Sequence, residues 1–384
     1  MQLSSLRVAL FFSLGVVAAG CGKKSSEGDP AAKPPTPPTA QPAAPTTPPP
    51  TAPTPPPAPA APTTPDKAQV TAMFKPLPAT FDDAAAPASD AMVALGQQLF
   101  FDTRLSKNQD VSCNTCHALD KFGVDGLATS KGHKGQLGTR NSPTVLNAAG
   151  HFAQFWDGRA ATIEEQAKGP VLNPVEMAML DDAHVVAVLK SIPDYAAAFG
   201  KAFPGQPDAV TFDNMAKAIG AFERKLATPG PFDKYLAGDE AALSDDAKHG
   251  LAVFMASGCT GCHTGPLLGG TMYMKTGLTA PYADTTDTGR FAVTKVETDK
   301  FMFKVPSLRN VAKTAPYFHD GKIADLPAAI REMGKLQLGK TFTDDEVKWI
   351  GAFLDSLTGE VPAALVTAPK LPKSGPKTPK PDPS

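Results

Sequence analysis

The pentapeptide CNTCH at residues 113–117 returns as CTGCH at residues 259–263, and this repetition decides how the 384-residue chain is organised. Each copy has the form Cys-x-x-Cys-His. The chain contains five cysteines, and the two copies hold all of them except Cys21. If both motifs are intact, no second cysteine is left to pair with Cys21 in a structural disulfide.

A Cys-x-x-Cys-His motif is typical of the covalent attachment of a c-type haem. The two cysteines form thioether bonds to the porphyrin, and the histidine becomes an axial ligand of the iron. A redox dithiol does not need the histidine, and a zinc site needs four ligands that converge on one metal. The sequence therefore predicts two haem c groups. The predicted attachment residues are Cys113, Cys116, His117, Cys259, Cys262 and His263.

The sixth ligand of each iron decides whether the haem carries electrons or reacts with a small oxidant. Of the seven histidines, His133 lies in a glycine-rich segment, so it is a candidate for a removable ligand or an exposed loop residue. For the second haem, spacing alone does not separate Met333 from Met272 or Met274. We interpret the remaining histidines as packing, surface or structural residues: His151, His184, His249 and His319.

The two ends of the chain differ in composition from its middle. Residues 1–20 combine one basic residue, an apolar run and small residues, which predicts a secretory signal. Cys21 follows and is predicted to be lipidated, with ordinary signal cleavage nearby as the alternative. Residues 21–66 are proline-rich and predict an extended linker, and residues 363–384 predict a disordered tail. We therefore expect a periplasmic protein tethered to a membrane only through its lipid anchor.

The segment between these ends is long enough for two domains. Because it contains one pentapeptide in each half, we predict an N-terminal haem domain over residues 67–230 and a C-terminal one over residues 231–362. The formal net charge of −1 gives no electrostatic case for nucleic-acid binding.

Several long motifs in matching order resemble those of the bacterial dihaem cytochrome c peroxidases. They include FFDTRLSKNQDVSCNTCHALDKFGVDG, NSPTVLNAAGHFAQFWDGRA, QAKGPVLNPVEM and FKVPSLRNVAKTAPYFHDG. The resemblance extends over roughly residues 95–357. It implies a mostly α-helical fold of two cytochrome c-like domains, each binding one covalently attached haem c, packed face to face.

The resemblance also implies different roles for the two pentapeptides. His117 matches the proximal ligand of the peroxide-reducing haem, and His133 matches the distal histidine that leaves on activation. His263 and Met333 match the two ligands of the electron-accepting haem.

Further residues acquire roles only through the resemblance. Trp156 matches a tryptophan between the haems, and Glu176 matches the acid/base of the peroxide pocket, with Gln166 nearby. The apolar neighbours of Glu176 in NPVEM would favour a raised pKa. A calcium site between the domains is implied by one side-chain oxygen and two backbone carbonyls, which are the hard ligands that calcium prefers. Its residues would be Asn141, Thr314 and Pro316.

These roles imply an enzyme that reduces hydrogen peroxide to water with electrons from a small cytochrome c or a copper protein, and a homodimer. Two alternatives remain open. One is a dihaem electron-transfer cytochrome without peroxidase activity. The other is a dihaem enzyme that oxidises a partner protein, for which the resemblance would require tyrosine rather than methionine at position 333.

Overall fold

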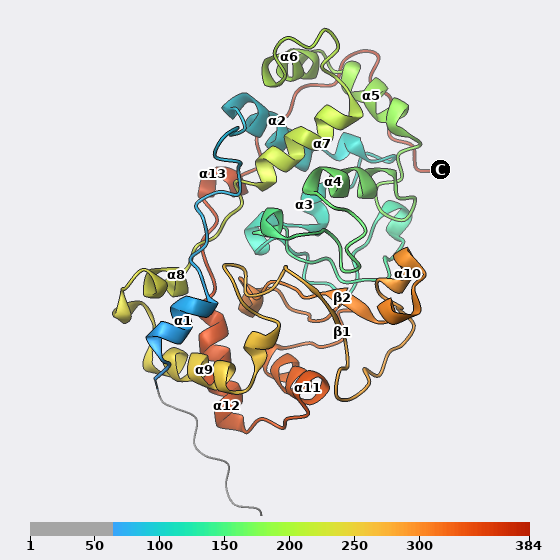
Figure 1. The fold of residues 1–384 in the computed structure, drawn as a ribbon. Helices are drawn as coiled ribbons and strands as arrows, with labels where there is room; N and C mark the ends of the chain where they lie inside the picture. The colour runs from blue at the N-terminus through green and yellow to red at the C-terminus, as the bar shows by residue number, and fades with distance from the viewer. Residues whose placement is uncertain (1–63) are drawn as a thin grey trace, which may run out of the picture. The chain divides into compact units, whose positions relative to one another are not determined.

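A computed structural model describes residues 64–384. The predicted signal peptide, Cys21 and most of the linker lie outside these residues. Within the described part, the chain is mostly helical, as expected, and no helix is long and apolar enough to cross a bilayer. The helices are α1 Lys67–Met73, α2 Asp90–Phe101, α3 Cys113–Cys116, α4 Ile163–Leu172, α5 Asp182–Lys190, α6 Pro193–Ala202, α7 Phe212–Glu223, α8 Pro231–Leu236, α9 Asp245–Ala256, α10 Phe291–Thr294, α11 Leu326–Leu338, α12 Asp344–Asp355 and α13 Ala363–Val366 (Figure 1).

The first hydrophobic core lies among α2 and α4–α7, with buried residues from Leu95 to Leu226. Helices α2 and α7 pack at Gly96, where an added Cβ would lie 1.9 Å from the carbonyl oxygen of Ala218. Thr211 begins α7 by accepting a hydrogen bond from the main chain of the first turn. Close contact between these two helices therefore depends on glycine at position 96.

The second core repeats this arrangement with α9 and α12. These helices pack at Gly250, where an added Cβ would lie 1.8 Å from the carbonyl oxygen of Trp349. Thr343 and Glu346 cap α12 reciprocally, each side chain accepting a hydrogen bond from the other residue's main chain. The core extends through residues 232–357 and includes helix α11.

Helix α1 belongs to the second core although it precedes the first core in the chain. Val70 and Phe74 are fully buried there, and the Phe74 ring meets the Phe232 ring edge-on with centroids 5.5 Å apart. Figure 1 shows α1 beside α8 and α9. The predicted N-terminal domain begins at residue 67, whereas α1 packs with the core that contains α8, α9 and α12.

A two-stranded antiparallel sheet follows the second pentapeptide. Strand β1 Tyr273–Lys275 pairs with β2 Met302–Lys304, with Met274 opposite Phe303. The same register places Lys304 opposite Tyr273.

The tail at residues 363–384, predicted to be disordered, instead follows a defined course along the first core. Leu365 packs against that core, and the Gln97 amide donates hydrogen bonds to the carbonyl oxygens of Ala364 and Leu365. At the chain end, the ammonium of Lys107 donates to the main-chain oxygen of Ser384 at 2.9 Å. Polar side chains of the folded surface thus pair with main-chain groups of the tail, for which composition predicts disorder.

Candidate haem and peroxide sites

The first pentapeptide forms the short helix α3. Ser112 and Thr115 cap it, and the Thr115 hydroxyl accepts a hydrogen bond from the Ser112 amide at 2.9 Å. The amide of His117 donates to the carbonyl of Cys113 at 2.9 Å, which places the imidazole directly after the turn. Both cysteines and the histidine therefore lie on one helical turn, as attachment to a single porphyrin edge requires.

The second pentapeptide lies on a 3₁₀ turn just after α9. Gly258 has φ +92°, a conformation that favours glycine, and it redirects the chain into the turn Cys259–Gly261. The Nδ1 atom of His263 lies 2.8 Å from the carbonyl oxygen of Leu268. A carbonyl only accepts, so Nδ1 carries the hydrogen and Nε2 is left with its lone pair, the state needed to bind iron.

The thiols of both motifs are unlike those of a redox dithiol. Burial raises the pKa of Cys113 to about 12, with the charge of Glu223 adding to the effect, and burial raises the pKa of Cys259 to about 12. Reactive dithiols have lowered pKa values. Among residues 64–384 the four motif cysteines are not joined in disulfides, and no cluster of three or more His, Cys, Asp or Glu side chains could hold a metal ion. Haem attachment remains the use that fits the two motifs.

A largely apolar cavity contains the second pentapeptide. Cys259, Cys262 and His263 line it, together with Met333 of α11 and Met274 of β1. Two attachment cysteines, a histidine whose Nε2 is available and candidate thioether ligands thus share one cavity, so these residues fit a haem c. Met272 is not among the lining residues, which reduces the sequence candidates to two.

His133, the predicted removable ligand, follows the first pentapeptide in the chain. His133, in the 3₁₀ turn His133–Gly135, is only 5% exposed, so it is not an exposed loop residue. Its amide donates to the carbonyl oxygen of Glu176 at 2.7 Å. Gly132 makes this approach possible, because an added Cβ would lie 2.1 Å from the carbonyl oxygen of Val175. His133 and Glu176 are therefore held together through the main chain.

The Glu176 side chain is half-buried. Burial raises its pKa, while the charge of Arg159 and a hydrogen bond from Asn173 act in the opposite direction. The Asn173 amide donates to Oε1 at 2.9 Å. Gln166, the other predicted residue of this pocket, lies on α4. A carboxyl with a raised pKa exchanges protons more readily near neutral pH than an ordinary glutamate does.

The His133 imidazole also reaches the end of the chain. Its Nε2 lies 3.3 Å from the main-chain oxygen of Ser384, and its Nδ1 has no hydrogen-bond partner in the described part of the chain. This contact could not be inferred from sequence, since 251 residues separate the two.

The residues predicted to lie between the haems line the cavity that contains the second pentapeptide. Trp156 lines it, and its indole N–H donates to the carbonyl of Asn141 at 2.9 Å. Asn141 donates its own Nδ2 to the carbonyl of Leu127, and among residues 64–384 no hydrogen bond reaches its Oδ1, an oxygen that can accept a hydrogen bond or bind a cation. Thr314 and Pro316 line the cavity as well. The structure brings these residues together, and the oxygen donors suit calcium.

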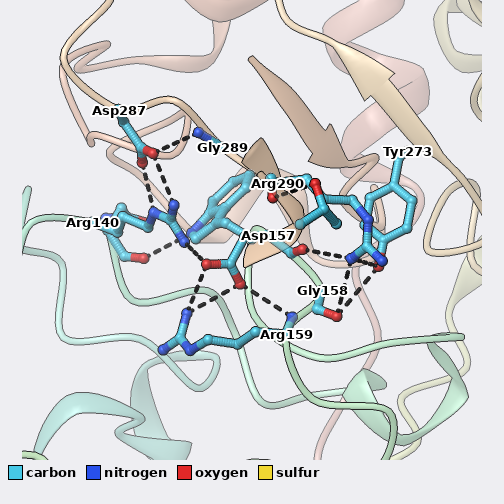
Figure 2. A network of polar contacts seen from close by, with 11 residues as sticks. Arg140, Asp157, Gly158, Arg159, Tyr273, Asp287, Gly289 and Arg290 are labelled. Atoms are coloured by element: carbon cyan, nitrogen blue, oxygen red, sulfur yellow. Dashed lines mark hydrogen bonds and ion pairs between the residues drawn. The ribbon is translucent and has the colours of Figure 1, made fainter. Parts of the chain in front are cut away.

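A network of charged residues holds this region in place (Figure 2). The guanidinium of Arg140 donates to Asp287 through Nε and Nη2, at 2.6 and 2.8 Å, and to Asp157 through Nη1 at 2.6 Å. Arg290 donates to the Asp157 carbonyl at 3.0 Å and to the Tyr273 hydroxyl at 2.7 Å. The network thus fixes the residues on either side of Trp156 and Asn141.

The four other histidines have separate environments. His319 is buried and stacks on Phe303 with ring centroids 4.2 Å apart, whereas His249 stacks on Trp349 at 3.8 Å. His184 is exposed. His151 is packed, as we expected, but its Nδ1 lies 2.7 Å from the ammonium of Lys304 at the cavity. Sequence reasoning missed Lys304, because nothing in its neighbours indicates that it is buried.

The chain is similar to several known proteins. The family model for "Di-haem cytochrome c peroxidase" matches residues 90–241. "Cytochrome c551 peroxidase" of Pseudomonas aeruginosa is 49% identical over 82% of this chain and 91% of its own, and the protein of that name from Nitrosomonas europaea is 47% identical over 78% and 89%.

Among solved structures, a MauG-like protein associated with microbial copper homeostasis is 29% identical, with a TM-score of 0.67, over 76% of this chain and 95% of its own. Two attachment motifs, the neighbours found around each and identity at this level over most of the chain lead to one conclusion. The chain belongs to the bacterial di-haem cytochrome c peroxidase family.

Proposed function

We propose that the chain reduces hydrogen peroxide to water with electrons from a small periplasmic cytochrome c or copper protein. Family membership makes it a haem-dependent peroxidase, and the names of the two relatives support a cytochrome as donor. The proposal includes two cytochrome c-like domains that face each other, each with one haem c.

The two haems would have unequal ligands. His117 and His133 would bind the iron of the peroxide-reducing haem, and His263 with Met333 that of the electron-accepting haem. The single observation that carries the proposal is the 2.7 Å bond from the His133 amide to the Glu176 carbonyl. It couples the predicted removable ligand to the predicted acid/base, so that movement of one segment affects the other.

Reduction of one peroxide molecule to two waters takes two electrons and two protons. Haem iron supplies peroxide binding and electron transfer when the group is bound. Glu176 would take a proton from the near peroxide oxygen and deliver it to the far one, and the raised pKa of its half-buried carboxyl supports this role. The Gln166 amide would help to orient the peroxide in the pocket.

Trp156 would lie on the route of electrons between the haems. Asn141, Thr314 and Pro316 would bind one calcium ion beside it, and within the described residues Oδ1 of Asn141 accepts no hydrogen bond. We also propose a periplasmic location with a lipid anchor at Cys21, and a homodimer.

A turnover assay on purified holoprotein tests the proposal, with reduced small cytochrome c as donor and spectra of the fully oxidised and half-reduced forms. We expect peroxide-dependent oxidation of the cytochrome and a change of spin state at one haem only. Electron exchange with the cytochrome without consumption of peroxide would instead establish the electron-transfer alternative. Two irons with identical, permanent ligands would contradict the proposed division of labour.

A further inference from the structure

Lys304 is a buried cation without an anionic partner. It ends strand β2, is 7% exposed and lines the cavity that contains the second pentapeptide. Within residues 64–384 it forms no ion pair, and the polar contact of its Nζ is with His151 at 2.7 Å. Burial alone lowers the pKa of Lys304 to about 7, since no carboxylate stabilises its charge. A buried ammonium is costly unless it is paired.

The contact with Lys304 also defines the protonation of His151. An ammonium can only donate, so Nδ1 of the neutral imidazole must accept, and the hydrogen lies on Nε2. Nε2 is buried and has no hydrogen-bond partner within residues 64–384. The pair therefore offers one buried N–H donor and one buried positive charge, and both residues line the cavity.

The pair is held rigidly. The Lys304 amide donates to the carbonyl of Trp156 at 2.8 Å, and the His151 amide donates to the carbonyl of Ala148 at 3.0 Å. Gly270, with φ +71°, packs against the imidazole so closely that an added Cβ would lie 2.5 Å from Cδ2. A fixed ammonium with no carboxylate partner and a fixed N–H with no acceptor, both judged within residues 64–384, are typical of a prepared anion site.

We propose that Lys304 and His151 bind a carboxylate, and that this carboxylate is a propionate of the haem attached at Cys259 and Cys262. The inference rests on the proposed haem attachment. A haem c is tethered through its vinyl edge and carries two carboxylates on the opposite edge, so the cavity that holds the tethered edge must also accommodate charge. Lys304 and His151 provide that charge balance in the wall of the same cavity, beside Trp156.

The pairing has a measurable consequence for the haem. A propionate favours the ferric form because of its negative charge, and a buried lysine cancels part of that effect. Removing the lysine should therefore lower the reduction potential of the second haem. We expect Lys304→Met to shift the ratio of oxidised to reduced haem about tenfold at a fixed potential, which is about 59 mV for one electron.

Lys340→Met is the matched control. Lys340 lies in the same domain and its charge acts on Cys259, but its side chain is 41% exposed and paired with Glu346. Solvent screens such a charge, so we expect less than about a twofold shift in the same ratio. Equal shifts in the two variants would overturn the inference, because they would reflect a general field rather than a contact.

His151→Phe provides a second, independent variant. It removes the Nε2–H donor and should lower the potential by less than Lys304→Met does. Because both side chains would serve one carboxylate, the double variant should shift the potential by less than the sum of the single variants. Additive shifts would show that the two residues do not share a ligand.

A crystal structure of the unmutated holoprotein tests the position of the propionates even if the variants do not fold. We expect a propionate oxygen within hydrogen-bond distance of Lys304 Nζ or His151 Nε2. A small inorganic anion at this position, or two propionates bound elsewhere, would overturn the inference. None of these readouts depends on peroxide turnover, so a chain that binds haem but lacks peroxidase activity would refute the proposed function and leave this inference standing.

Discussion

Arg140 and Asp287 form a two-point ion pair that joins the segment following His133 to the loop following β1, with N–O distances of 2.6 and 2.8 Å. Paired in this way, planar guanidinium and carboxylate groups fix orientation as well as distance. Arg140 immediately precedes Asn141, whose carbonyl accepts the Trp156 indole hydrogen. The ion pair therefore controls the position of the tryptophan at the haem cavity.

Replacing Asp287 by asparagine should destabilise the holoprotein. The change leaves Arg140 with Asp157 alone and removes a charge-assisted bond, which costs about 1–3 kcal/mol of unfolding free energy. Denaturant unfolding measures the effect. Asp355→Asn removes one partner of the exposed Lys313–Asp355 pair and should cost at most ~1 kcal/mol. Similar costs for the two substitutions would mean that the first pair is no more than a surface contact.

The two glycine-dependent helix contacts should not tolerate a methyl group. Gly250→Ala would place Cβ 1.8 Å from the main-chain oxygen of Trp349, so α9 and α12 must separate. We expect a loss of at least ~2 kcal/mol in unfolding free energy. Gly200→Ala on α6 is the matched control: nothing lies within 4 Å of its added Cβ, and alanine should stabilise the helix by roughly 0.5–1 kcal/mol. Equal stabilities would refute the close contact.

Met333 and Met274 are the two candidate thioether ligands that line the cavity of the second pentapeptide. Met333→Leu should lower the reduction potential of the second haem and abolish its methionine-to-iron charge-transfer band, because leucine keeps the volume but cannot ligate. Met274 lines the same cavity, and Met274→Leu should preserve both the reduction potential and the charge-transfer band. Redox titration followed by visible and near-infrared spectra separates them. If Met274→Leu loses the band instead, the ligand assignment must be exchanged.

Glu176→Gln should leave both haems attached and reduce peroxide turnover by at least ~10²-fold, because the amide cannot transfer the proton. The measurement is steady-state turnover, with haem content determined on the same sample. Glu360→Gln removes an exposed carboxylate and serves as the control. Near-normal turnover in the Glu176 variant would mean that another group acts as acid and base.

The sequence predicted most of what depends on local pattern. The pentapeptides identify the attachment residues because thioether bonds require that spacing. The Leu268 carbonyl that orients His263, by contrast, became visible only in the structure, since any residue supplies a carbonyl. The roles of Thr314 and Pro316 rest only on the resemblance, because their expected contribution is main-chain oxygen.

Composition alone does not indicate what the tail contacts. Proline and lysine content predicts little apolar burial, but it says nothing about hydrogen bonds between tail carbonyls and side chains such as Gln97 and Gln109. Helix α1 illustrates a second limit. Its apolar residues predict burial of Val70, yet periodicity cannot indicate which of two cores receives it.

Glu223 gives the fold a specific dependence on pH. Burial raises the pKa of this carboxyl to about 8, and the charge of Glu164 adds to the effect. The folded chain therefore retains a proton that the unfolded chain releases above its ordinary pKa. The stabilisation is fully present below about pH 4.5 and is lost as the pH rises through about 8.

Glu223→Gln fixes the neutral form and should remove this loss. At pH 9 the variant should be more stable than the unmutated holoprotein by about 5 kcal/mol, whereas the two should be alike near pH 4.5. Denaturant unfolding across this pH range measures the difference, with Glu360→Gln as an exposed control that should follow the unmutated chain. Parallel pH profiles for Glu223→Gln and the unmutated protein would mean that Glu223 is already ionised in the fold, and its burial would then have to be compensated by a cation that the carboxylate contacts in the holoprotein.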